Sequence, residues 1–174
     1  IFFPHLCVYM YKDKIKRLMP YCAQAERCTQ DVMKKLVSWE VPEEEIEEIL
    51  EKLRTEKFLD DTRYANSFVA DKWRLDQWGR VKIRNGLFQK GISEQLIQSA
   101  LDTIDQEAYI SVMENLLEKK RTTIRKEPVI SQMKKLISFG AGRGFEEELI
   151  WQWLEKVGLY FDSNTSEGQE VDFS

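Results

Sequence analysis

The chain has 174 residues, of which 43% are apolar and 32% charged, with a formal net charge of −4 at pH 7. No stretch approaches the roughly 20 uncharged apolar residues of a membrane helix, so we do not expect a membrane protein. A single histidine, His5, excludes most metal sites and most histidine-based catalysis. We therefore expect no catalytic residues, no metal and no cofactor.

Residues 1–10 differ from the rest of the chain, because they carry no Lys or Arg and begin with Ile. They lack the basic start and the small-residue cleavage site of a secretory signal. We expect them to be a non-native or disordered leader that ends at a natural start, Met10; a short apolar arm packed on the body is the alternative. The three cysteines lack metal-ligand spacing, which predicts free thiols and a cytoplasmic protein.

From Tyr11 onward, apolar residues recur every three or four positions, which is typical of amphipathic helices, and strand-like alternation is absent. Thr29 and Ser93 are predicted N-caps, and Gly91 and Gly158 are predicted helix ends. The acidic tail, residues 159–174, is predicted to be disordered. The pattern predicts an all-α protein with nine helices, near residues 11–26, 29–39, 43–56, 61–76, 80–90, 93–104, 106–121, 128–139 and 146–157.

The helix spacing repeats along the chain. Six apolar positions of the first three helices were compared with the positions 51 residues later and a further 53 residues later. Eleven of these twelve later positions are apolar, whereas the composition of the chain alone predicts about five. The six starting positions are Val32, Leu36, Val41, Ile46, Leu50 and Leu53. This predicts three tandem three-helix repeats, at 11–57, 58–104 and 105–158.

Charge follows the same repeat. The blocks 1–42, 62–93 and 119–145 carry net charges of +3, +5 and +7, and the blocks 43–61, 94–118 and 146–174 carry −6, −6 and −7. The first two helices of each repeat are therefore basic and the third is acidic. This polarity indicates an anionic partner, and ordinary solvated helix faces are the alternative.

Motif searches give no catalytic constellation. The glycines of the segment FGAGRGF, Gly140, Gly142 and Gly144, predict a flexible turn between helices, since no strand precedes them as a phosphate-binding loop requires. The Asp60–Asp61 pair is predicted to cap the helix that starts near residue 61. Helical spacing assigns Trp73 and Trp153 to the core.

The segment FLDDTRYANSFV, residues 58–69, resembles the LDD-x-R-[FY]-A-x-x-[FY] signature of the RecX family of bacterial recombination regulators. Residues 79–83, Leu87 and residues 90–92 are similar to the family's G-x-x-[RK]-I-x-x-x-L-x-x-[KR]-G-I stretch, and the resemblance covers about residues 20–158. Phe58 and Glu40 stand where the family usually has Gly. The motif residues, whose roles are mainly structural, are Leu59, Asp60, Asp61, Arg63, Tyr64, Ala65, Phe68, Gly79 and Gly91.

We expect Leu59, Tyr64, Ala65 and Phe68 to join the core of the second repeat. The spacing places residues 64, 65 and 68 on one helix face. Arg63 and Asp60 are then expected to hold the junction between the repeats.

The resemblance implies that the three repeats form an elongated, curved helical array. It also implies a monomer that binds RecA recombinase filaments on single-stranded DNA. Such a protein inhibits ATP hydrolysis, strand exchange and coprotease activity, and so regulates DNA repair and the SOS response. A DNA-binding helical protein and a helical-repeat scaffold for another partner are the alternatives. The residues expected to contact the filament or its DNA are Lys72, Arg74, Arg80, Lys82, Arg84, Lys90, Lys119, Lys120, Arg121, Arg125, Lys134 and Lys135.

Overall fold

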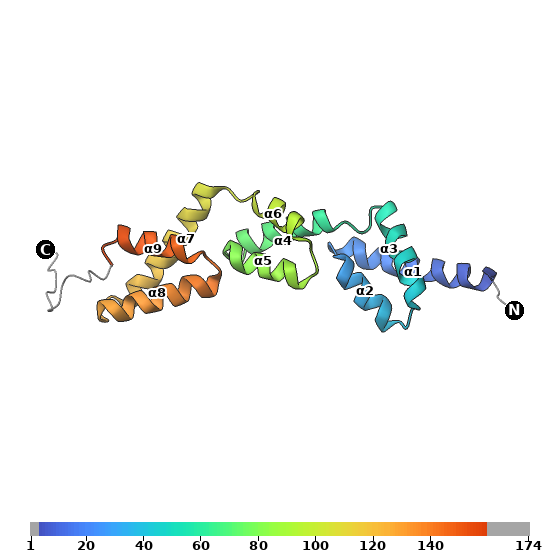
Figure 1. Ribbon diagram of the computed structural model, residues 1–174, viewed down its shortest axis with the longest axis horizontal. Helices are drawn as coiled ribbons and strands as arrows, with labels where there is room; N and C mark the ends of the chain where they lie inside the picture. Colours follow the sequence, from blue (N-terminus) through green and yellow to red (C-terminus); the bar gives the residue numbers. More distant parts are fainter. Residues whose placement is uncertain (1–3, 160–174) are drawn as a thin grey trace. The chain divides into compact units, whose positions relative to one another are not determined.

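The computed structural model describes the backbone of residues 4–159 and the side chains of residues 13–159, and every regular element in this range is an α-helix (Figure 1). The helices are α1 (Pro4–Gln24), α2 (Thr29–Ser38), α3 (Glu43–Thr55), α4 (Asp61–Arg74), α5 (Arg80–Gln89), α6 (Glu94–Leu101), α7 (Gln106–Ile124), α8 (Val129–Arg143) and α9 (Glu147–Lys156). They form two compact units that meet in sequence between Asp105 and Gln106. The all-α fold built from three-helix repeats is confirmed.

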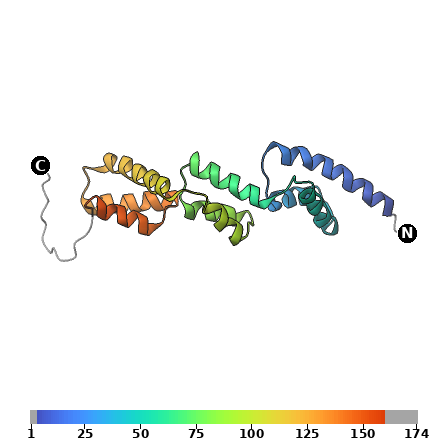
Figure 2. The ribbon, with the colours of Figure 1, turned by 90° about the horizontal axis from the view of Figure 1, so that it is seen from above.

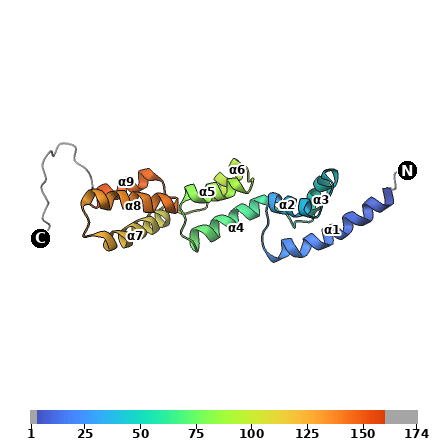
Figure 3. The same cartoon turned by 90° about the horizontal axis from the view of Figure 1, so that it is seen from below.

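Unit 1 contains the first two helix triples. In the first, α3 contacts both α1 and α2, and its fully buried Ile49, Leu50 and Leu53 fill the space between them. In the second, α4, α5 and α6 contact one another, and Figure 3 shows α5 and α6 on the same side of α4. Period-3.6 spacing thus gives each helix one apolar stripe, and three stripes close each core.

Unit 2 contains the third triple, in which α8 contacts both α7 and α9 (Figure 2). Tyr109 is fully buried there, and its hydroxyl donates a 2.5 Å hydrogen bond to the carboxylate of Glu146, the N-cap residue of α9. Buried phenolic hydroxyl groups require such a partner, so this bond fixes α9 relative to α7.

Three sequence-based boundaries are wrong. Helix α1 begins at Pro4, where proline is tolerated in the first helical turn, so the backbone of residues 4–10 is helical rather than disordered. That these residues form a non-native leader stays a prediction. Residues 1–3 lie outside the described residues. Leu159 is buried in unit 2 rather than part of a disordered tail, because its N–H bonds the carbonyl of Leu154 behind the left-handed Gly158. The rest of the predicted tail lies outside the described range.

The third wrong boundary is the glycine segment 140–144. Helix α8 continues through Gly140 and Gly142 to Arg143 and ends at Gly144, which has a left-handed φ of 88°. Packing explains the continuation, because a Cβ on Gly140 would lie 2.6 Å from Cδ1 of Ile150 on α9. The glycine therefore permits close contact between two helices, and this burial outweighs its poor helix propensity.

Of the two predicted N-cap residues, Thr29 is wrong and Ser93 is confirmed. The N-cap of α2 is Cys28, and Thr29 is the first helical residue. Ser93 is the N-cap of α6, but its side chain makes no capping hydrogen bond. The backbone N–H of Thr29, at the start of α2, donates instead to a side chain of the second repeat, described below.

Candidate functional site

The LDD segment joins the first two repeats through its second aspartate. Asp60 caps its own helix, α4, by accepting hydrogen bonds from the N–H groups of Thr62 (2.9 Å) and Arg63 (3.0 Å). Asp61 instead accepts two hydrogen bonds from Thr29, one from the N–H (2.8 Å) and one from the hydroxyl (2.7 Å). Its carboxylate thus lies at the positive N-terminal end of α2, where a negative charge is stabilising. Asp61, and not Asp60 as expected, reaches across the junction.

Two ion pairs connect the same repeats. Arg63 Nε lies 2.6 Å from a carboxylate oxygen of Glu26, and this hydrogen bond raises the pKa of Arg63. Lys90 Nζ lies 2.9 Å from a carboxylate oxygen of Asp31, which likewise raises the pKa of Lys90. We call the pairs Thr29–Asp61, Glu26–Arg63 and Asp31–Lys90 the repeat junction.

The apolar motif residues do not all join the core of the second repeat. Tyr64 and Ala65 of α4 are buried, and burial raises the pKa of the Tyr64 hydroxyl to about 12. Leu59 belongs to the core of the first repeat, contrary to expectation, because its N–H bonds the carbonyl of Leu53 and keeps it in the turn that ends α3. Phe68 is only half-buried, with its ring lying against Gly86.

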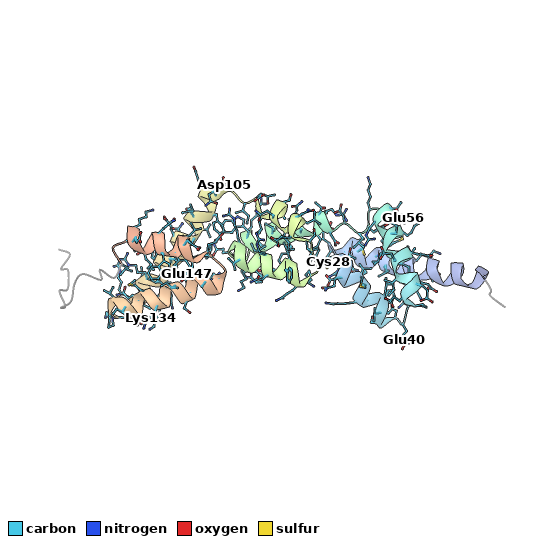
Figure 4. All side chains as sticks on the ribbon, viewed as in Figure 1. Cys28, Glu40, Glu56, Asp105, Lys134 and Glu147 are labelled. Atoms are coloured by element: carbon cyan, nitrogen blue, oxygen red, sulfur yellow. The ribbon has the colours of Figure 1, made fainter. Side chains whose placement is uncertain are left out.

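The buried thiol of Cys28 also lies at this junction, at the start of α2 (Figure 4). Burial raises its pKa to about 11. The two motif glycines have separate roles. Gly79 is the N-cap of α5, and Gly91, with a left-handed φ of 71°, lies against Gln30 of α2.

The six basic residues predicted in the second repeat have different local partners, and their contact with a filament stays a prediction. Lys72 and Lys82 flank Trp78, with their Nζ atoms 4.7 and 4.5 Å from the centroid of the Trp78 ring. Lys72 also bonds Asp76, and Arg74 is exposed. We call Lys72, Arg74, Trp78 and Lys82 the second-repeat basic patch.

The other three basic residues make contacts within the fold. Arg80 donates to the carbonyl of Ile104 at 3.3 Å. Arg84 pairs with the α6 carboxylate of Glu94, and Lys90 belongs to the repeat junction. These three therefore hold α5 in place, which the sequence pattern alone did not indicate.

In the third repeat, a shallow groove of about 680 Å³ between α7 and α8 is lined by Lys120, Lys134, Lys135 and Phe139, among others. Lys134 is exposed on α8 (Figure 4). The remaining predicted residues lie along α7 and the loop that follows it. Arg121 and Arg125 lie 3.3 and 3.9 Å from carboxylate oxygens of Glu118, and Lys119 is exposed.

Cation–aromatic contacts occur between the first and second helices of every repeat, and the sequence analysis missed those of the first repeat. There, Arg17 lies 4.3 Å from the centroid of the Trp39 ring, and Arg27 and Lys35 lie 4.2 and 4.4 Å from that of Tyr21. In the third repeat, Arg143 and Lys120 lie 5.6 and 6.0 Å from the Phe139 centroid. The repeat offsets do not predict these contacts, since they carry Trp39 and Lys35 to Lys90 and Gly86, whereas the contacts of the second repeat lie at Lys72, Trp78 and Lys82.

The described residues contain no cluster of three or more side chains suited to holding a metal ion. None of their helices has the length and apolar character to cross a membrane. The surface that the described part of the chain offers a partner carries charge, aromatic rings and exposed aliphatic side chains such as Leu75 and Val37.

Comparison with known proteins places these features in a family. A family model described as "RecX, second three-helix domain" matches residues 60–101, which contain the LDD segment from Asp60 onward and α5. The "Regulatory protein RecX" of Clostridium acetobutylicum is 31% identical over 153 residues, which cover 86% of this chain and 70% of that protein. The chain belongs to the RecX family. The RecX protein of Limosilactobacillus reuteri is 33% identical, and the chain spans 50% of its length.

Solved RecX structures share the fold. One crystal structure of a "regulatory protein RecX" has a TM-score of 0.76 at 30% identity and covers 83% of this chain and 71% of its own. The crystal structure of RecX from Lactobacillus salivarius has a TM-score of 0.78 at 22% sequence identity. The match covers 86% of this chain and 97% of the Lactobacillus chain. Several other RecX relatives are longer, and the chain spans 56% of the one from Levilactobacillus brevis.

Proposed function

We propose that this RecX-family protein binds RecA filaments on single-stranded DNA, as a cytoplasmic monomer, and inhibits ATP hydrolysis, strand exchange and coprotease activity. Through this inhibition it regulates DNA repair and the SOS response. Membership of a family of regulatory proteins carries the proposal.

The surface chemistry supports a polymeric anionic partner. Each three-helix repeat carries a basic surface with an aromatic ring on its first two helices and an acidic third helix. Several weak contacts on linked repeats give high combined affinity for a partner that itself repeats, without a single deep pocket. A nucleoprotein filament has that character.

The second-repeat basic patch is the stronger candidate for the contact with RecA. Arg80 and Arg84 hold α5 in place, so reversing their charge would perturb the fold as well as any interface. Arg74 and Lys82 are the better probes. Each exposed ionic contact contributes about 1 kcal/mol or less, so both are changed together.

The test is RecA ATP hydrolysis on single-stranded DNA, with and without this protein. We expect the wild-type protein to slow hydrolysis, and Arg74→Glu/Lys82→Glu to need about tenfold more protein for the same inhibition. The control is Lys52→Glu/Lys156→Glu, which changes net charge equally on the third helices of two repeats. Circular dichroism of both variants checks that the helices remain.

Two results would contradict these expectations. A wild-type protein that leaves RecA hydrolysis unchanged would remove the proposed function and favour a scaffold or a DNA-binding protein. Inhibition that falls equally in both double variants would show that net charge matters and that the second-repeat patch does not form the interface.

A further inference from the structure

The α7–α8 groove of the third repeat is a shallow, open depression of the surface that is lined by basic side chains. Its lysines come from both helices, Lys120 from α7 and Lys134 and Lys135 from α8. The surrounding block, residues 119–145, carries a net charge of +7 with a single acidic residue. A groove with one sign of charge focuses the field and attracts anions.

The groove also contains an aromatic ring. Phe139 lines it and is half-buried, with Lys120 and Arg143 near the ring. Grooves that combine positive charge along their length with an aromatic ring bind single-stranded nucleic acid, because phosphates meet the cations and an unpaired base can stack on the ring. A duplex offers no unpaired base to such a ring.

We propose that the α7–α8 groove binds a single-stranded nucleic acid directly, with Lys120 and Lys134 at phosphates and Phe139 against a base. This deepens the proposed function by giving the third repeat a ligand of its own. The experiment below contains no RecA. A failure of direct nucleic-acid binding can therefore be told apart from a failure of the proposed RecA inhibition.

Glu127, the acidic member of the groove, opposes this binding. Its carboxylate accepts hydrogen bonds from Lys135 Nζ at 2.6 Å and from the Ser131 hydroxyl at 2.7 Å. These bonds hold the pKa of Glu127 below its ordinary value, so it stays charged at neutral pH. The charge repels phosphate and pairs with one of the three lysines, so neutralising it should strengthen binding.

The experiment measures the fluorescence anisotropy of labelled oligo(dT) with the full chain over a range of salt concentrations. Replacing Lys120 and Lys134 together by Ala should weaken binding about tenfold and lower the slope of log K against log salt by about 1.4, since each phosphate contact on a single strand contributes about 0.7. The matched control, Lys52→Ala/Lys156→Ala, removes the same charge outside the groove and should change both quantities little.

The second arm tests for a gain of affinity. Glu127→Gln should tighten oligo(dT) binding severalfold. The matched Glu114→Gln removes an equal charge from α7 outside the groove, where Glu114 pairs with Lys156 at 2.9 Å, and should have a smaller effect. Phe139→Leu should weaken binding to oligo(dT) but not to an abasic oligomer of the same length.

Three outcomes would overturn the proposal. Wild-type protein that causes no anisotropy change shows that the groove has no such ligand. Equal effects of the groove variants and their controls show attraction by net charge alone. Poly-glutamate that displaces oligo(dT) at equal charge concentration shows a site for acidic protein rather than for nucleic acid.

Discussion

Glu40, Gly91 and Gly144 end the second helix of their respective repeats with a left-handed backbone, at φ values of 55°, 71° and 88°. The repeat offsets of 51 and 53 relate the three positions. The hydrogen bonds are equivalent too, since the next residue's N–H bonds a carbonyl five residues earlier in each case, as in Val41 to Leu36. Glycine adopts this conformation freely, whereas a residue with a Cβ is strained by about 1 kcal/mol or more.

Replacing Glu40 by Gly should therefore stabilise unit 1 by about 1 kcal/mol, because Glu40 is exposed at the end of α2 (Figure 4) and its side chain lies outside the core of the first repeat. Urea unfolding followed by circular dichroism measures the change. Gly91→Ala, the reverse change at the equivalent position, should lower stability by a similar amount. A destabilised Glu40→Gly protein would show that the Glu40 side chain contributes more than its backbone strain costs.

Residue-scale features were predictable when their cause was local in sequence. The capping of α4 by Asp60 depends on residues two and three positions away, and it was predicted correctly. The bond from Thr29 to Asp61 spans 32 positions, and that between Lys90 and Asp31 spans 59. Nothing in the sequence pattern relates such pairs, because only the folded arrangement of the repeats brings them together.

At the scale of the elements, apolar spacing located the helices well, because each helix of unit 1 and unit 2 buries one stripe. The end of α8 was wrong because a local rule, that glycine ends helices, competed with a tertiary contact. Gly140 is buried against Ile150, whereas Gly142 has no atom within 4 Å of where its Cβ would lie. The same segment thus contains one glycine required by packing and one that is not.

This contrast predicts opposite effects of one substitution. Gly140→Ala should destabilise unit 2 by about 1–3 kcal/mol, since the added methyl group overpacks the α8–α9 contact. Gly142→Ala, two residues along the same helix, should stabilise it by about 0.4–1 kcal/mol through helix propensity. Both changes are measured by urea unfolding.

Shortening the opposing side chain provides the check. Ile150→Val removes Cδ1, the atom nearest the added methyl, so it should cost less stability in the Gly140→Ala background than in the wild type. Equal costs in both backgrounds would mean that the overpacking lies elsewhere.

At the scale of the whole molecule, the chain folds as two compact units, and the repeat junction lies entirely within the first. The three repeats were predictable from periodicity. Their division into two units was not, because the sequence repeat treats both boundaries alike, and it is the junction residues that join the first repeat to the second.

The two units should unfold as separate cooperative groups. Asp61→Ala removes the carboxylate at the start of α2 and should cost about 1–2 kcal/mol, the usual cost of losing a helix cap. Hydrogen exchange measured by mass spectrometry should then show faster exchange in residues up to 105 and unchanged exchange beyond them. Gly140→Ala should give the reverse pattern. A single transition, shifted in both units by either substitution, would contradict this independence.

The repeat junction also determines when the first repeat can finish folding during synthesis of the chain. Protein synthesis proceeds from the N-terminus, yet the first repeat takes Leu59 into its core, an N-terminal cap for α2 from Asp61 and an ion pair from Lys90. At 5–20 residues per second, the ribosome needs about 2–6 s to pass from residue 59 to residue 90. During that interval the first repeat exists without its full set of stabilising contacts, so its native state is completed only when the second repeat has been made.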